Sequence, residues 1–196
     1  MIRLIAKGIC VLVIVCSYSI ESALAAPTVS VKGRRTDVAL SSELLNALET
    51  LGVGVQPIKN ARIRRGQAKF PIPAGELDLE TAAGEIWHTG GLSLSAGETV
   101  VDLSLFIIDT TTPGAAVLTG IVKANDTLIG RLPLFDIELP SLKLPLAAKS
   151  RITIPNANLT LTEEAAAALN SVFNVEAFVE GFPIGTAHVV LRALTR

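Results

Sequence analysis

The chain is 196 residues long and nearly balanced in charge, with 17 lysine and arginine residues against 18 aspartate and glutamate residues. Hydrophobic residues make up 49% of it, which is enough to bury one core and predicts a single domain. The balanced charge and the few aromatic residues argue against a nucleic-acid-binding protein.

Residues 1–25 have the three parts of a secretory signal. A positively charged start is followed by the largely apolar run 8–20 and then by Ala23-Leu24-Ala25, which offers the small residues that a signal peptidase reads. The apolar run has about 13 residues, fewer than the roughly 20 that cross a bilayer as a helix. We therefore predict cleavage before Ala26, no transmembrane anchor afterwards, and a secreted, periplasmic or cell-surface protein.

Cleavage at that point removes both cysteines, the only methionine and the only tyrosine. Residues 26–196 would then hold no disulfide, no thiolate metal site and no cysteine nucleophile. A lipoprotein anchored through Cys16 is the alternative, but the residue before that cysteine is Val15 rather than a small residue.

Hydrophobic residues with a period of two dominate the rest of the chain. The clearest run is Val101, Leu103, Leu105 and Ile107, and similar runs recur as far as residue 161. Such alternation is typical of strands with one buried face, and short turn segments separate the runs. We predict a mainly β fold of about a dozen strands, either an antiparallel β-sandwich or a partly open barrel.

Two segments have helical spacing instead. Residues 43–51 follow Ser41 or Ser42 as a cap and end before Gly52, which is a common helix terminator. The second segment begins after Thr162 with two glutamates, which are favourable at the positive end of a helix, and Asn174 can end it. We therefore predict two short helices in the domain.

Basic residues are concentrated near the start of the predicted domain. Residues 26–69 hold eight of them against three acidic residues. Six of the eight form two clusters, which are Lys32, Arg34, Arg35, Arg62, Arg64 and Arg65. They indicate either a surface that contacts an anionic part of the cell envelope or simply a solvated strand face and loop.

Sequence signatures of catalysis are largely absent. No G-x-S-x-G, H-E-x-x-H or P-loop motif occurs, and no pair of base and nucleophile can be named. Glu76, Asp78 and Glu80 alternate on a predicted strand, as a row that is either hydrated or neutralised by a cation such as Ca²⁺. We predict no enzyme and no catalytic or metal-binding residue, and a carboxylate-based hydrolase is the least favoured alternative.

The most distinctive stretch is 85–91, Glu-Ile-Trp-His-Thr-Gly-Gly, which holds the only tryptophan and one of the two histidines. Adjacent strand residues point to opposite faces, so at most one of Trp87 and His88 lies in the core. In one interpretation His88 binds a metal or haem iron at a strand end. In the other, Trp87 fills the core and His88 caps the turn or faces water. We interpret His188 as an edge-strand residue.

Three parts of the chain resemble the HtaA-like, haem-transport-associated domains of secreted bacterial proteins. They are 84–92 with the following strand 100–109, 118–120 with 131–136, and 159–169 with 183–187. The resemblance covers most of residues 36–194, and it implies one HtaA-like β domain over residues 26–196.

The resemblance also implies a ligand. In that family a tyrosine is the main haem ligand and a nearby histidine assists it. No tyrosine follows residue 25, so only the histidine can be carried over, onto His88, with Trp87, Phe106 or Phe135 as an apolar wall. The expected function is therefore an exported, non-enzymatic protein that binds haem or a small apolar ligand. A cell-surface structural or adhesion module is the alternative.

Overall fold

The alternating residues form strands in the computed structural model, which describes residues 28–147 and 151–194. The predicted signal, residues 1–25, lies outside the described residues. The strands are β1 (Thr28–Leu40), β2 (Gly54–Ile58), β3 (Arg62–Arg64), β4 (Gln67–Phe70), β5 (Ala74–Asp78), β6 (Gly84–Trp87), β7 (Gly91–Ala96), β8 (Thr99–Asp109), β9 (Val117–Ala124), β10 (Thr127–Glu138), β11 (Arg151–Leu161) and β12 (Pro183–Ala193). The helices are α1 (Ser42–Thr50) and α2 (Glu163–Phe173).

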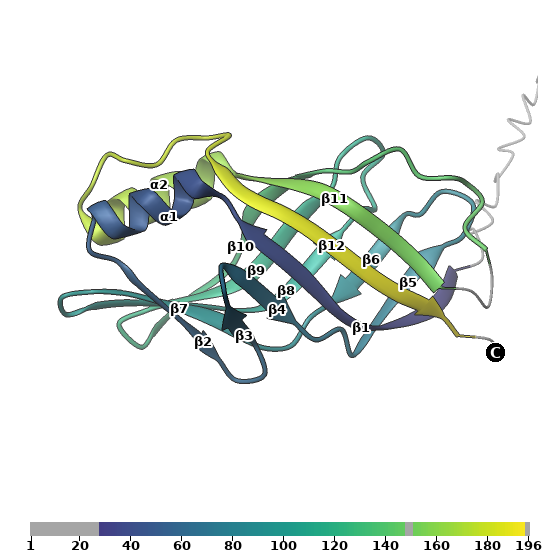
Figure 1. The fold of residues 1–196 in the computed structure, drawn as a ribbon, viewed down its shortest axis with the longest axis horizontal. Coiled ribbons are helices and arrows are strands. Elements are labelled where there is room, and N and C mark those ends of the chain that lie inside the picture. The colour runs from purple at the N-terminus through teal and green to yellow at the C-terminus, as the bar shows by residue number, and fades with distance from the viewer. Residues whose placement is uncertain (1–27, 148–150, 195–196) are drawn as a thin grey trace, which may run out of the picture.

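Eight of the strands close into an antiparallel barrel (Figure 1). Their order around the barrel is β1, β12, β11, β10, β9, β8, β6 and β5, and residues 28–31 of β1 complete the ring by pairing with β5. The mainly β, antiparallel prediction is confirmed, and of the two predicted architectures the barrel is the one that forms.

Two long strands, β1 and β8, each change partner along one edge. Residues 28–31 of β1 pair with β5 and residues 36–39 pair with β4. Residues 107–109 of β8 pair with β6 and residues 99–104 pair with β7. The barrel wall therefore divides into two branches. In one branch β3 pairs with β4, and in the other β2 pairs with β7, while β2 and β3 are not hydrogen-bonded to each other.

Both predicted helices are present, and they lie at the same end of the molecule (Figure 1). The hydroxyl oxygen of Ser41 accepts the backbone N–H of the residue three places later at 3.0 Å, and that of Thr162 does the same at 3.2 Å. Each hydroxyl also donates to a carbonyl outside its helix, that of Pro183 at 2.7 Å and that of Pro133 at 2.9 Å. The caps therefore attach the starts of the helices to the barrel. No helix among the described residues is long and apolar enough to cross a membrane.

The core fills the interior of the barrel and continues under the helices. Its most deeply buried large side chains are Leu77, Ile86, Leu161, Leu191 and Val31. They come from five neighbouring strands of the ring, β6, β5, β1, β12 and β11, because every second residue of an antiparallel barrel strand faces inward. Any cavity in this core is therefore walled by residues from the whole length of the chain.

The structure corrects two predictions about polar residues. Glu76, Asp78 and Glu80 do not form a row, because β5 ends at Asp78 and its buried carboxylate accepts the backbone N–H of Glu80 at 2.6 Å. That carboxylate is buried and closes a turn, so it is not part of an exposed acidic row. His188 is exposed, but β12 lies between β1 and β11, so His188 is not an edge-strand residue.

Candidate functional site

The stretch around His88 lies where the strand paired with β8 changes from β6 to β7. β6 ends at Trp87, and the chain crosses to β7 along the neighbouring half of β8. In β8 the register shifts at the same level, and Leu105 takes a left-handed conformation with a φ of 51°. The backbone N–H of His88 donates to the carbonyl of Phe106 at 2.8 Å, which joins the crossing segment to the shifted part of β8.

Two glycines make this crossing sterically feasible. Gly90 has a φ of 90°, and a Cβ atom there would collide with the backbone nitrogen of Ala61. A Cβ atom at Gly91 would collide with the carbonyl oxygen of Leu103. The Gly-Gly pair therefore allows close backbone approach, which is a structural role.

Trp87 and His88 point to opposite faces, as expected, but in the order that was not predicted. The Trp87 side chain is 39% exposed, and its indole N–H donates to the Glu85 carboxylate at 2.9 Å. His88 is 4% exposed and faces the interior. The interpretation in which Trp87 fills the core and His88 faces water is therefore wrong. The register of the short β6 strand decides the direction of each side chain, whatever their hydrophobicity.

His88 pairs inside the barrel with a threonine that sequence reasoning did not identify. Its Nε2 atom lies 2.7 Å from the hydroxyl oxygen of Thr36 on β1, and Thr36 is also buried. The Nδ1 atom has no hydrogen-bond partner among the described residues. Burial lowers the pKa of His88 to about 4, and the carbonyl groups of Phe106 and Ile86 offset this only in part. His88 is therefore neutral at physiological pH.

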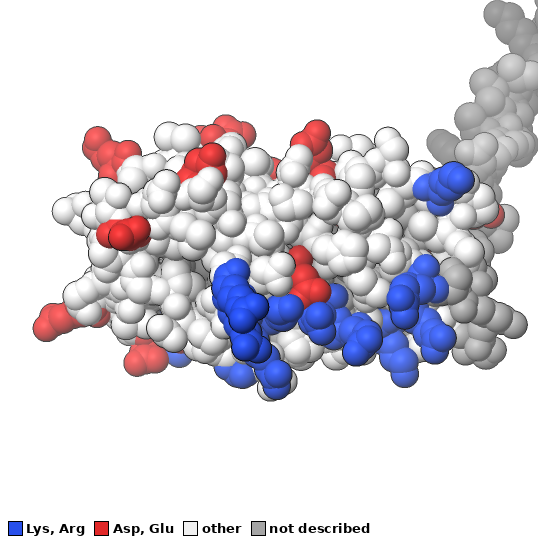
Figure 2. All heavy atoms as spheres, viewed as in Figure 1, with Lys and Arg blue, Asp and Glu red and all other residues white. Residues whose placement is uncertain are grey.

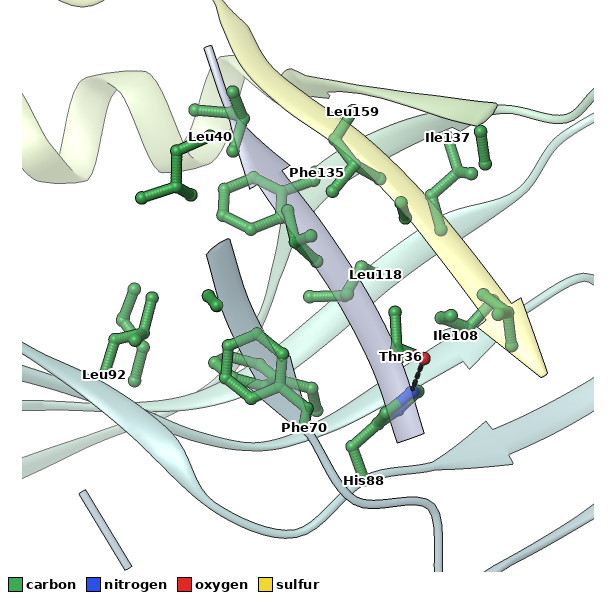
Figure 3. Close-up of a pocket in the computed structure, with 18 of the residues that line it drawn as sticks. Thr36, Leu40, Phe70, His88, Leu92, Ile108, Leu118, Phe135, Ile137 and Leu159 are labelled. Atoms are coloured by element: carbon green, nitrogen blue, oxygen red, sulfur yellow. Dashed lines mark hydrogen bonds between the residues drawn. The ribbon is translucent and has the colours of Figure 1, made fainter. Parts of the chain in front are cut away.

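A cavity of about 120 Å³ lies in the interior beside this pair (Figure 3). Its lining is almost wholly apolar and reaches from Leu44 of α1 and Phe173 of α2 to Ile108 of β8. Phe106 and Phe135, two of the aromatic residues predicted to wall a pocket, line it, whereas Trp87 does not. His88 and Thr36 are part of the wall. The cavity can therefore accept a small molecule that makes few polar contacts.

The residues of this cavity do not fit a haem group held by His88. Pockets for larger ligands measure roughly 300–1,000 Å³, well above the 120 Å³ found here. An axial histidine binds iron through a ring nitrogen with a free lone pair. Nε2 of His88 lies 2.7 Å from the Thr36 hydroxyl, so only Nδ1 is open to such a bond, and it faces an interior too small for haem.

The two basic clusters predicted from the sequence lie on neighbouring strands. Lys32, Arg34 and Arg35 are on β1, while Arg62 and Arg64 are on β3 and Arg65 follows in the turn. β4 pairs with both of these strands and brings the clusters onto one face (Figure 2). This face is outside the barrel and separate from the cavity.

The fold is similar to those of three solved domains from Corynebacterium glutamicum. The C-terminal domain of HtaA has a TM-score of 0.64, with 84% of this chain and 99% of that domain covered. The N-terminal domain of HtaA has a TM-score of 0.61 over the same shares. The haem-binding protein HtaB has a TM-score of 0.59, with 86% of this chain and 96% of HtaB covered.

Sequence identity to each of the three is 13%, so these comparisons establish the fold. No protein-family model and no curated protein matches the chain. The chain therefore has an HtaA-like fold, as the three resembling segments indicated.

Proposed function

We propose that this HtaA-like domain is a non-enzymatic binding protein whose interior takes a small apolar ligand. The observation that carries the proposal is the apolar cavity of about 120 Å³ between the helices and His88. A protein cavity of about 150 Å³ lined by leucine, isoleucine and phenylalanine stays dry and binds benzene. A cavity of similar size and lining suits a ligand of that kind.

The polar pair in the wall narrows the class of ligand. His88 is neutral and Thr36 is uncharged, so the cavity offers no charge to balance an ionised ligand. Burying an unpaired charge in an apolar interior is strongly unfavourable. An uncharged hydrocarbon or aromatic molecule is therefore the expected class of ligand.

Haem is the second candidate ligand, because one of the similar structures is a haem-binding protein. Since the interior cavity is too small for haem, a haem group would bind elsewhere on this scaffold.

We also propose that the domain is exported, on the strength of the signal-like residues 1–25. Sequencing the N-terminus of the exported form should give Ala26 within two residues, and retention of residues 1–25 or a lipid on Cys16 would contradict this.

The ligand proposal can be tested with toluene as a probe. A ligand that binds only the folded state raises the thermal unfolding midpoint, so saturating toluene should raise that of the wild type. Leu118→Phe places a larger side chain in the cavity wall and should abolish the increase. The matched variant Leu128→Phe, at a side chain that is 64% exposed, should retain it. An equal increase in both variants, or none in the wild type, would overturn the proposal.

Native mass spectrometry of protein from its own culture identifies the natural ligand. We expect a co-purified mass that belongs to an uncharged apolar molecule and that Leu118→Phe lacks. A co-purified haem mass in both the wild type and Leu118→Phe would support the second candidate instead.

A further inference from the structure

Charge is distributed unevenly among the strands. Five adjacent strands, β11, β12, β1, β4 and β3, carry eight basic residues and a single acidic one, Asp37, among the residues that the structure describes. Figure 2 shows these basic side chains along one face, with most of the acidic side chains in view lying away from them. We call this face, together with Arg65 in the β3–β4 turn, the basic band.

The pairing of the strands places like charges opposite one another. Arg192 of β12 lies opposite Lys32 of β1 on one side and opposite Arg151 of β11 on the other. Lys69 of β4 likewise lies opposite Arg62 of β3. Like charges directly opposite on neighbouring strands destabilise a sheet. Arg151 and Arg192 extend the band beyond the two clusters that the sequence reveals. The sequence does not reveal these two residues as part of a cluster, because they lie far from Lys32 along the chain.

Little negative charge compensates for this repulsion. Asp37 lies 2.7 Å from Arg35 and 3.4 Å from Lys69, and these are the ion pairs of the band among the described residues. The row formed by Arg151, Arg192 and Lys32 includes no carboxylate. An anionic partner would relieve the repulsion that the fold leaves in place.

Three arginines of the band lie at irregular points of the backbone. The register of β1 against β12 shifts between Gly33 and Arg35, and this irregularity leaves both Arg34 and Arg35 exposed. Arg65 occupies a left-handed conformation with a φ of 53°, which asparagine or glycine adopts at lower cost. At position 65 the band therefore keeps an arginine where the backbone alone would favour another residue.

We propose that the basic band docks onto the surface of an anionic lipid bilayer. Five strands spaced about 4.8 Å apart make a face about 19 Å wide, which suits a sheet of headgroups better than one polymer strand. Binding of single-stranded nucleic acid usually relies on exposed aromatic side chains. The only Phe, Tyr or Trp residue on these five strands is Phe70, and it is buried. This proposal does not depend on what occupies the cavity.

Sedimentation with lipid vesicles tests the proposal. The protein should sediment with vesicles that contain phosphatidylglycerol and not with vesicles of phosphatidylcholine alone. Raising the salt concentration should release it, because salt screens charges at an exposed surface. Two paired variants, Arg62→Gln with Arg64→Gln and Lys32→Gln with Arg192→Gln, should each weaken binding at least fivefold.

A matched control removes two basic residues elsewhere. Lys123→Gln with Lys143→Gln changes the net charge equally but lies outside the band, and it should bind vesicles like the wild type. All three variants should keep the wild-type unfolding midpoint within a few degrees, since the replaced side chains are at least partly exposed. Equal loss of binding in the control and band variants, or no binding to anionic vesicles, would overturn the proposal. Tighter band-dependent binding to DNA or to an anionic polysaccharide than to vesicles would also overturn it.

Discussion

A single histidine shows how position decides the role of a residue in this protein. His88 lies inside an apolar barrel, bonded to Thr36 and neutral because burial lowers its pKa to about 4. An unpaired buried polar group is unfavourable, so the Thr36 hydroxyl is the contact that makes the histidine tolerable in the core. Its structural contribution is a polar link between β1 and the segment after β6.

The lowered pKa of His88 predicts that acid destabilises the folded protein. In the unfolded chain His88 takes up a proton near pH 6.5, whereas in the folded protein it does so only near pH 4. Its contribution to stability is therefore complete above about pH 6.5 and declines as the pH falls toward 4. The total loss is about 3 kcal/mol. Urea unfolding between pH 7.5 and pH 4.5 measures it.

Two variants isolate the histidine from other titrating groups. Thr36→Val with His88→Leu replaces both partners with apolar side chains, which can be nearly neutral for stability. In this variant the part of the decline between pH 6.5 and pH 5 should disappear. His188→Ala removes the exposed histidine and should leave the decline unchanged. A decline that persists in the double variant would show that another group causes it.

The sequence predicted this site only in part. That Trp87 and His88 face opposite sides follows from strand geometry. Which of the two faces inward depends on how β6 pairs, and the register shift in β8 near Leu105 leaves no pattern in the hydrophobic residues. Thr36 lies 52 positions before His88, so only the closed barrel brings the two together. The Gly90-Gly91 pair was the available signal that the backbone passes close to another strand.

At the scale of elements, the helix starts are the best-predicted features. Capping depends on a few adjacent residues, so local sequence assigned Thr162 and narrowed the first cap to Ser41 or Ser42. The structure has Ser41 and Thr162 as the caps. Local sequence does not indicate that each cap hydroxyl also donates to a distant carbonyl. Through that second contact, Ser41 and Thr162 each link the start of a helix to a barrel strand.

We expect Thr162→Ala to lower the free energy of unfolding by about 2 kcal/mol. The variant loses the N-cap bond to Ala165, typically about 1 kcal/mol, and leaves the partly buried carbonyl of Pro133 without this donor. Thr162→Ser retains the hydroxyl and should recover most of the loss. Urea unfolding of both variants measures the effect, and equal losses in the two would contradict the double role.

The crossing between β6 and β7 predicts a second element-scale effect. Gly90→Ala should lower the free energy of unfolding by about 3 kcal/mol or more, because its Cβ atom would meet the backbone of Ala61 at a φ of 90°. The matched change Gly97→Ala, at a φ of 57° with open space around it, should cost only about 1 kcal/mol. Chemical denaturation compares them, and similar losses would show that conformational strain alone is responsible.

At the scale of the whole molecule, strand periodicity predicted the class of fold but not the closure of the barrel. Alternating hydrophobic residues indicate which side of a strand faces the core, equally in a sandwich and in a barrel. The register shift in β8 interrupts this alternation, so Leu105 is exposed and Phe106 is buried. The choice is made by contacts distant in sequence, such as Val31 opposite Ala193. The basic band also depends on contacts distant in sequence, since Arg151 and Arg192 join Lys32 only when β12 pairs with β1.

The size of the cavity predicts the response to haem. Hemin titration should give weak or no specific binding, since the cavity of about 120 Å³ is smaller than the pockets that hold larger ligands. Absorbance near the Soret maximum should change equally in the wild type, His88→Ala and His188→Ala. Tight stoichiometric binding that only His88→Ala abolishes would contradict this.

The pairing of the first strand with the last has a consequence for the growing chain. Until β12 is made, β1 and β11 each keep an unpaired edge, although β12 lies between them in the finished barrel. Such open edges readily pair with other chains, and contacts this distant in sequence form slowly. A nascent or C-terminally shortened chain therefore exposes two strand edges that can pair with other chains. It is protected from this aggregation only when β12 has paired with both β1 and β11.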